Sequence, residues 1–335
     1  MVSFSYTSND LQAIAEKILD LHPDPVPRFR LLRDVLRLDP ASPVYQQAQA
    51  ALQDTGVVRL LESSQLPDGT WGRLHTQDTS VKQPFVTTEA AIAAALVSGL
   101  DMHSPILIKT QAAILDYVDG KTYWPDPPEK HDNPLAWFVW VRHYSAAVLS
   151  QIDPFHPGLE PFWNLWAEAV QLAFQSGSYD RLKEIEALNV LMNCRMKRPV
   201  PFHSKYPMLI LSATRNQLPA DLERRVLEFV MQYPPGIYYT YDRPIHTPPG
   251  IQDKHFWGWT QAHLLLSRFR LWKEMAVDAL NGIWAQRDEH GFWDLGNKMA
   301  RKPFTNFPLS ESWRRPVNRI MDYTVEMMSL LVRGL

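Results

Sequence analysis

The stretch Gln65-Leu66-Pro67-Asp68-Gly69-Thr70-Trp71-Gly72 decides the fold, because a shortened form of it returns along the chain. The recurring part is a glycine followed within four residues by Trp or Tyr, and successive glycines are 51, 57, 59 and 55 residues apart. An interval of this length holds two helices and two loops, so the pattern predicts a repeat architecture. The other sites are Gly120-Lys121-Thr122-Tyr123-Trp124, Gly177-Ser178-Tyr179, Gly236-Ile237-Tyr238 and Gly291-Phe292-Trp293.

Helical patterns flank each of these sites, with apolar residues at three- and four-residue spacing. Valine and isoleucine form no alternating runs of the kind that strands need. With a further pair near the N-terminus, the sequence predicts an all-α chain of about six helical hairpins. The expected helices are 10–21 and 29–36, 44–62 and 86–100, 103–118 and 135–152, 159–175 and 181–194, 220–232 and 254–270, and 271–286 and 317–332.

We expect these hairpins to close into one α/α toroid domain over residues 1–335, with residues 1–43 completing the ring. The second helix of each pair is expected to form the inner layer around a central lumen, because those helices carry small or aromatic residues on most faces. Two long irregular stretches, 196–219 and 238–253, interrupt the pattern. Loops of this length inside a compact domain are often functional.

Composition excludes several classes of function. The chain has 34 basic and 36 acidic residues and no long basic run, so no nucleic-acid groove is expected. Cys194 is the single cysteine, which rules out a disulfide framework and a cysteine-based zinc cluster. The longest apolar stretch, 90–100, is too short to span a bilayer, and residues 1–10 do not read as a signal peptide. The cytoplasm is therefore the expected location.

The first loop resembles the Gln-x-x-Asp-Gly-x-Trp-Gly repeat of triterpene cyclases such as squalene–hopene cyclase. The fifth, Gln286-Arg287-Asp288-Glu289-His290-Gly291-Phe292-Trp293, is similar with one extra residue. The chain thus resembles the terpenoid-cyclase and protein-prenyltransferase α/α toroid superfamily over residues 44–332. The local interpretation is structural: Gln caps the outer helix, Asp-Gly makes the turn and Trp packs between repeats.

The catalytic motifs of that superfamily are absent from the sequence. Neither the Asp-x-Asp-Asp acid of class II cyclases nor the Asp-Asp-x-x-Asp magnesium site of class I synthases occurs. Prenyltransferases bind zinc through Asp-x-Cys and a distant histidine, but here Met192 stands two residues before Cys194. The resemblance therefore brings no catalytic residue with it, and we expect no metal and no cofactor.

Polar residues recur on the expected inner helices, where unpaired polar groups would be costly unless they line a site. The non-functional interpretation is that such residues are paired core groups or face solvent, and we expect this for about half of them. His255 resembles the zinc-binding histidine of prenyltransferases in its position at the entry of a helix. The candidate catalytic residues are His255, Asp322, Glu326, Glu186 and His143, and the candidate substrate-binding residues are Trp140, Tyr144, Phe256, Trp259, His263, Asn189 and Glu89.

These residues favour an enzyme that acts on a hydrophobic, isoprenoid-like small molecule in an aromatic cavity. The expected chemistry is cyclase-, lyase- or isomerase-like proton transfer, with His255 and Asp322 as the first pair to consider. One alternative is an α/α-barrel glycan hydrolase or lyase, because such enzymes also have Trp- and Tyr-lined clefts. The other is a non-catalytic module that binds a lipid or a peptide. Substrate identity and oligomeric state do not follow from the sequence.

Overall fold

The fold is helical throughout the part of the chain that the computed structural model describes, which is residues 3–76, 80, 82–128, 134–196, 198–213, 217–296 and 308–335. Outside the helices, the described residues form only the isolated bridges Ser204–Tyr238 and Ile237–Tyr241. The predicted all-α class is confirmed. The chain forms two compact units: Met1–Ser63, Ala93–Leu100 and His246–Leu335 make the first, and Ser64–Ile92 and Asp101–Ile245 the second. Closure into a single toroid stays a prediction.

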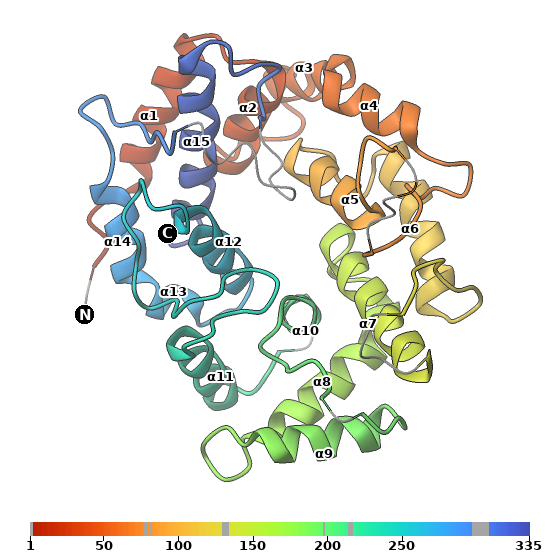
Figure 1. The fold of residues 1–335 in the computed structure, drawn as a ribbon. Coiled ribbons are helices and arrows are strands. Elements are labelled where there is room, and N and C mark those ends of the chain that lie inside the picture. Colours follow the sequence, from red (N-terminus) through yellow and green to blue (C-terminus); the bar gives the residue numbers. More distant parts are fainter. Residues whose placement is uncertain are drawn as a thin grey trace. The chain divides into compact units, whose positions relative to one another are not determined.

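The first unit is built around α15 (Pro316–Leu331), which packs against α2, η1, α12 and α14 (Figure 1). Every described residue of α15 from Met321 to Leu331 is buried, so this helix forms the core of the unit. The other elements are α1 (Ser8–Asp20), α2 (Pro25–Arg30), the π-helical turn η1 (Leu31–Val35), α3 (Pro43–Ala51), η2 (Leu52–Asp54), α4 (Gly56–Ser64), α12 (Phe256–Leu266), α13 (Trp272–Met275) and α14 (Val277–Ala285).

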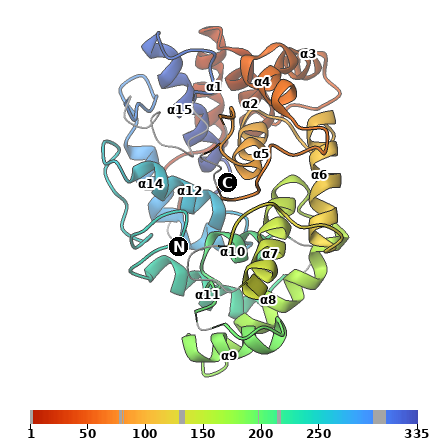
Figure 2. The same ribbon diagram turned by 45° about the vertical axis from the view of Figure 1, so that its right-hand side comes forward.

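The second unit is built around α7 (Pro134–Ile152), which packs against α6 and α10 (Figure 2). Helix α8 packs in turn against α9 and α10. Helix α5 (Thr88–Val97) begins in this unit and ends in the first. The remaining elements are α6 (Pro105–Val118), η3 (Pro157–Leu159), α8 (Glu160–Ala173), α9 (Arg181–Leu191), α10 (Lys205–Leu211) and α11 (Ala220–Gln232).

Two of the expected helices are each broken in two. The helix expected over 44–62 stops before Thr55, whose backbone is extended and whose hydroxyl caps the next helix by accepting the Val58 N–H at 3.4 Å. The helix expected over 271–286 is interrupted at Ala276. A third difference is α10, which lies in the stretch 196–219 that was expected to be irregular. Its seven residues are too few to show a helical period.

The repeated glycines are turn residues, as predicted. Gly69, Gly120, Gly177, Gly236 and Gly291 all have a positive φ, between 68° and 93°. A side chain at Gly69 would also collide with the backbone, because a Cβ atom there would lie 2.6 Å from the Lys109 carbonyl oxygen. The positive φ, which glycine adopts without strain, is the condition that all five loops share and explains why glycine returns at each of them.

The aromatic residue of each well-matched loop is part of the core. Trp71 and Trp293 are both buried, and their backbone N–H groups donate to Thr88 Oγ1 at 3.0 Å and Thr324 Oγ1 at 3.1 Å. The structural interpretation of these residues is therefore correct. Gln65 differs from expectation: its side-chain amide does not cap its own helix.

Gln65 instead ties its loop to the neighbouring helix α6. Its Nε2 atom lies 3.0 Å from the carbonyl oxygens of Gly69 and Ile106 and 3.0 Å from Thr110 Oγ1. The glutamine thus bridges the turn of one repeat and the first helix of the next. This cross-link is the physical reason for a glutamine at the start of the motif.

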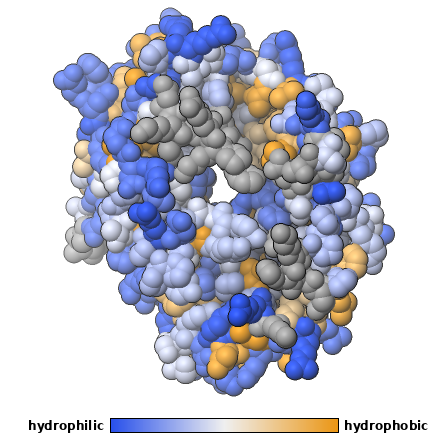
Figure 3. Space-filling model, in the orientation of Figure 1, coloured by the Kyte–Doolittle hydropathy of each residue, from blue (hydrophilic) through white to orange (hydrophobic). Residues whose placement is uncertain are grey.

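The face shown in Figure 3 is mostly hydrophilic, with hydrophobic residues in small separate groups. Among the described residues, no helix is both long enough and apolar enough to cross a membrane.

Candidate functional site

A cluster of ionisable and hydroxyl side chains lies in the second unit, where the first turn of α5 meets the first turn of α10. We call the residues His75, Glu89, Lys205 and Tyr206 the Glu89 cluster. Lys205 Nζ donates to Glu89 Oε1, and the Tyr206 hydroxyl donates to Glu89 Oε2 at 2.8 Å. The same hydroxyl is 2.8 Å from His75 Nδ1, which itself lies 3.3 Å from Glu89 Oε2. One carboxylate thus holds a lysine, an imidazole and a phenol together.

Two further tyrosines surround the imidazole. The His75 ring centroid lies 5.4 Å from that of Tyr144, on α7, and 5.4 Å from that of Tyr239. Tyr144 also packs on Tyr206, with centroids 4.3 Å apart. The polar cluster therefore has an aromatic wall. Such a combination of apolar faces and a few convergent polar groups is typical of small-molecule sites.

His75 is fixed in place by its backbone. The Asp126 carboxylate accepts the N–H groups of Leu74, His75 and Thr76 at 2.7–2.9 Å. The start of α5 is attached to the same segment, because the Glu89 N–H donates to the Leu74 carbonyl at 3.1 Å. The backbones of His75 and Glu89 are thus held by separate hydrogen bonds, one to Asp126 and one to Leu74, and this keeps the two side chains preorganised.

The start of α10 is anchored as well. Ser204 precedes the helix and forms the isolated bridge with Tyr238, while the Lys205 N–H donates to the Tyr238 carbonyl at 3.1 Å. These bonds set the position of Lys205 and Tyr206 relative to the following residue, Tyr239. Both long stretches that the sequence analysis singled out, 196–219 and 238–253, thus contribute to the cluster.

The electrostatics of the cluster favour a charged carboxylate and a protonated phenol. Burial opposes ionisation of Glu89, but the Lys205 charge and the hydrogen bond from His75 hold its pKa well below the usual range. Burial and the neighbouring Glu89 charge raise the pKa of Tyr206 well above 10. Lys205 keeps 30% of its side chain exposed and Tyr239 is 41% exposed, so the cluster is open on one side.

Two of the twelve candidate site residues belong to this site. Glu89 is its central carboxylate and Tyr144 part of its wall, and Trp140 packs behind Tyr144 with centroids 6.4 Å apart. The sequence analysis missed His75, Lys205, Tyr206 and Tyr239. His75 stands three residues after the quoted motif, and the tyrosine doublet 238–239 follows a repeat glycine, but no spacing rule connects these positions.

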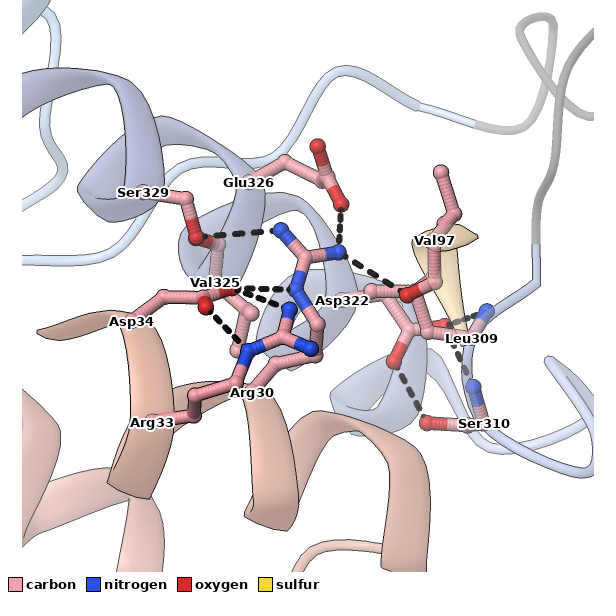
Figure 4. Close-up of polar contacts among 10 residues, drawn as sticks. All are labelled: Arg30, Arg33, Asp34, Val97, Leu309, Ser310, Asp322, Val325, Glu326 and Ser329. Carbon is pink, nitrogen blue, oxygen red and sulfur yellow. Dashed lines mark hydrogen bonds and ion pairs between the residues drawn. The ribbon is translucent and has the colours of Figure 1, made fainter. Parts of the chain in front are cut away.

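Glu326 belongs to a separate ion-pair network in the first unit (Figure 4). Arg30 Nη1 lies 2.5 Å from Glu326 Oε1, and Arg30 Nε lies 2.5 Å from Asp34 Oδ2. Arg30 also donates to Ser329 Oγ at 3.1 Å and to the Val97 carbonyl at 3.1 Å. Glu326 was expected to be a catalytic residue, but its carboxylate is buried and neutralises the buried Arg30.

Asp322 supports a loop and does not pair with His255. Its carboxylate accepts the N–H groups of Leu309 and Ser310 at 2.9 Å and the Ser310 hydroxyl at 2.6 Å (Figure 4). It also accepts the Trp313 indole N–H at 2.6 Å. Burial raises the pKa of Asp322 to about 6, against the opposing effect of these donors. The predicted His255–Asp322 contact is absent from the described residues, because the loop 309–313 occupies this carboxylate.

His143 and His263 are neutral core imidazoles. Each accepts an indole N–H at Nδ1, from Trp166 at 3.1 Å and from Trp272 at 3.3 Å. Burial lowers the pKa of both to about 3. Neither histidine can therefore take up a proton readily at neutral pH. These surroundings contradict the open acid–base role expected for His143 and the ligand contact expected for His263.

Helix α9 does not form an inner layer in its unit. Glu186 has 67% of its side chain exposed and pairs with Lys183 at 3.0 Å on the same helix. Asn189 is half-buried and holds a turn through two bonds to the Met196 backbone, at 2.7 and 3.2 Å. The expected interior positions of these residues are wrong because α10, and not α9, supplies the helix that packs on α7.

The last three candidate residues lie at the start of α12. His255 is the N-cap residue, half-buried, and its N–H donates to Asp253 Oδ1 at 2.8 Å. Phe256 and Trp259 are fully buried core residues, which leaves them no surface for a ligand. A catalytic role for His255 stays a prediction.

Comparison with known proteins found no family model, no curated protein and no solved structure that matches the chain. Within the described ranges, no group of three or more His, Cys, Asp or Glu side chains is placed to hold a metal ion.

Proposed function

We propose that the protein is an acid–base enzyme of the lyase or isomerase type and that the Glu89 cluster is its active site. The observation that carries this proposal is the Tyr206 hydroxyl, which lies 2.8 Å from both His75 Nδ1 and Glu89 Oε2. Contacts of this length hold the imidazole in one orientation, as a general base requires. Titratable groups that share one carboxylate in a partly open, aromatic-walled site are typical of catalytic centres.

The proposed reaction begins with removal of a proton from a carbon next to a carbonyl or carboxylate group. His75 takes this proton, and the electron pair moves toward the oxygen of the substrate. The Lys205 ammonium, which is 30% exposed, offers a positive charge for that developing anion. His75 then returns the proton to another carbon in an isomerase or to a departing oxygen in a lyase.

Glu89 and Tyr206 act as positioning residues in this scheme. The carboxylate fixes the imidazole, whose Nδ1 lies 3.3 Å from Glu89 Oε2. Tyr206 keeps its proton at neutral pH, because burial and the Glu89 charge raise its pKa. It therefore serves as a hydrogen-bond donor and not as the base.

The alternatives from the sequence can be ranked on this site. A glycan hydrolase needs two carboxylates flanking the bond to be cleaved, but Glu89 is the only carboxylate among the residues of the cluster. A lyase needs one base and a cation, which the cluster has. An isoprenoid-like substrate remains a second proposal, supported by the tyrosine rings. The experiment below also distinguishes an enzyme from a protein that only binds a ligand.

The test is solvent exchange measured by proton NMR in D2O with a panel of 2-oxo acids, sugar acids and isoprenoid alcohols. We expect loss of one carbon-bound proton signal from at least one compound, and His75→Gln should slow that exchange at least about 100-fold. Glu89→Gln should lower kcat for exchange more than it changes KM, a split that lost packing alone would not cause. Tyr123→Phe is the control, because Tyr123 is 64% exposed and outside the cluster.

Equal exchange rates in the parent protein and in His75→Gln would refute the proposal. Ligand binding without exchange or turnover, unaffected by His75→Gln, would support the non-catalytic alternative.

A further inference from the structure

Two adjacent tyrosines form an exposed aromatic shelf beside the Glu89 cluster. Tyr238 is 56% exposed and Tyr239 is 41% exposed, and their ring centroids lie 4.0 Å apart. The Tyr239 ring also contacts the reactive side of the cluster, with centroids 5.4 Å from His75 and 5.8 Å from Tyr206. A ligand that lies on this shelf therefore reaches the imidazole.

The shelf is held in a strained conformation. Tyr239 has a φ of +68°, a conformation that residues with a Cβ atom rarely adopt. The strain is imposed by neighbouring bonds: the Thr240 N–H donates to the Ile237 carbonyl at 2.9 Å, and the Tyr241 N–H donates to the same oxygen at 2.9 Å. Strained residues of this kind cluster at ligand sites, and glycine would remove the strain here.

Buried hydroxyl groups without a partner accompany the cluster. Ser204 Oγ, Thr240 Oγ1 and Thr76 Oγ1 are buried and make no hydrogen bond within the described part of the chain. Each belongs to the residue next to a shelf or cluster member: Lys205, Tyr239 and His75. Buried polar atoms in folded proteins are nearly always paired, so these three hydroxyls, each next in sequence to a shelf or cluster residue, lack the partner that such atoms normally have.

We propose that this site recognises a sugar acid, that is, a hydroxylated ring that carries a carboxylate. The nonpolar face of a sugar ring stacks on tyrosine, its hydroxyls can pair with Ser204 and Thr240, and its carboxylate suits the Lys205 ammonium. This inference rests on the proposed acid–base function and names its substrate class. A hydrocarbon would leave the unpaired hydroxyls unpaired, whereas a neutral sugar would bring no negative charge to the exposed part of Lys205, which among the described residues is otherwise ion-paired only with Glu89.

The corresponding reaction is β-elimination from an oligosaccharide in which the oxygen on the β-carbon of the sugar acid is linked to the next sugar. The C–H bond next to the carboxylate breaks and its proton goes to His75. A C=C bond forms to the neighbouring carbon as the C–O bond of that carbon breaks. The departing oxygen takes the proton from His75, so the products are an unsaturated sugar acid and an alcohol, with no other reactant required.

Binding is to be measured by isothermal titration calorimetry with oligogalacturonate, oligoglucuronate, neutral cello-oligosaccharide and farnesol. We expect an acidic oligosaccharide to bind at least tenfold more tightly than the neutral one. Tyr239→Gly should weaken that binding at least tenfold without lowering the melting temperature, because glycine accepts the positive φ. Lys205→Met should remove the preference for the acidic sugar. Tyr123→Gly, at an exposed tyrosine outside the shelf, is the matched control.

Ser204→Ala and Thr240→Val provide a second, independent arm. Because these hydroxyls have no partner in the protein, both variants should keep the parent melting temperature while they weaken binding of the acidic sugar several-fold. Failure of every acidic oligosaccharide to bind at millimolar concentration would overturn the inference.

The two proposals fail in different ways. If the NMR panel shows His75-dependent exchange with another compound but no sugar acid binds, the acid–base function stands and the substrate class is wrong. If a sugar acid binds through Tyr239 but is neither exchanged nor cleaved, the substrate class stands and the proposed catalysis is wrong.

Discussion

The Arg30 network and the Glu89 cluster are built from the same types of group but differ in their exposure. In the first unit, the side chains of Arg30 and Glu326 are 7% and 6% exposed, and the arginine bonds to two carboxylates, a hydroxyl and a carbonyl. In the second unit, the side chain of Lys205 is 30% exposed, and its partner Glu89 also contacts the His75 imidazole and the Tyr206 phenol. The buried Arg30–Glu326 pair can only hold its helices together, whereas the partly exposed Lys205–Glu89 pair can also contact a ligand.

This difference teaches how to separate structural from functional charges in the chain. Both carboxylates lie on helices and both were candidate site residues on the sequence alone. Glu326 and its partner Arg30 are both buried, which marks Glu326 as a structural residue. Glu89 has a partly exposed partner, Lys205, and two titratable neighbours, His75 and Tyr206, which makes it the better candidate for a catalytic site.

Removal of Arg30 should have the largest effect. Arg30→Met would leave Glu326 buried without its partner, while Asp34 would keep its bonds from Arg33, so we expect the free energy of unfolding to fall by about 3–5 kcal/mol. Urea denaturation followed by tryptophan fluorescence measures it. The double variant Arg30→Met/Glu326→Met should recover part of the loss, and a loss below about 1 kcal/mol in Arg30→Met would show that the network is not structural.

The repeat tryptophans test both units in the same way. Trp71→Ala in the second unit and Trp293→Ala in the first should each lower the free energy of unfolding by about 3–5 kcal/mol, because each indole is buried. Thermal denaturation of the two variants provides the comparison. Unchanged melting temperatures for both would contradict the structural role of the repeat.

Acid should destabilise both units through their neutral histidines. Burial lowers the pKa of His143 and His263 to about 3, so the unfolded chain binds protons first, near pH 6.5. Stability should therefore fall as the pH drops from 6.5 toward 3, by up to about 1.4 kcal/mol per pH unit for each histidine. Denaturation midpoints at pH 7, 6, 5 and 4 measure this slope.

His143→Gln and His263→Gln are the control variants for this slope, since glutamine can still accept the indole N–H. Each should remove about half of the histidine contribution. A slope that neither substitution changes would show that other groups cause the acid sensitivity.

Lys205→Met should give the smallest loss of stability, about 1–2 kcal/mol, because Glu89 keeps the Tyr206 and His75 bonds and the lysine is partly solvated. The same urea titration as for Arg30→Met gives the value directly. A loss equal to that of Arg30→Met would erase the distinction between the two ion pairs.

Much of the helical architecture followed from the sequence because its signals are local. The 3.6-residue period placed α11 and α15 within one residue at each end, and the turn at glycines such as Gly291 followed from the repeat. Helix α10 was missed because its apolar run is too short to show a period. Closure of the ring depends on contacts that no local pattern specifies.

The candidate site was harder to predict because its residues come from four separate segments. His75, Glu89, Tyr206 and Tyr239 meet only after α5 and α10 are anchored to loops. The expectation of a common inner layer included Glu89 and Tyr144 but also drew in Glu186, which faces solvent. A polar residue on a helix has the same sequence signature whether it binds a ligand, a buried arginine or water.

The repeat glycines also differ in how freely they can change over evolutionary time. At Gly236 a side chain would run into the Tyr241 and Arg243 carbonyl oxygens, while at Gly177 nothing lies within 4 Å of the added atom. Gly177 is thus held by its φ of 93° alone, a conformation that asparagine can share at modest cost. The third loop accordingly constrains its glycine least, and it lacks the Gln and Asp of the first loop while it keeps the turn.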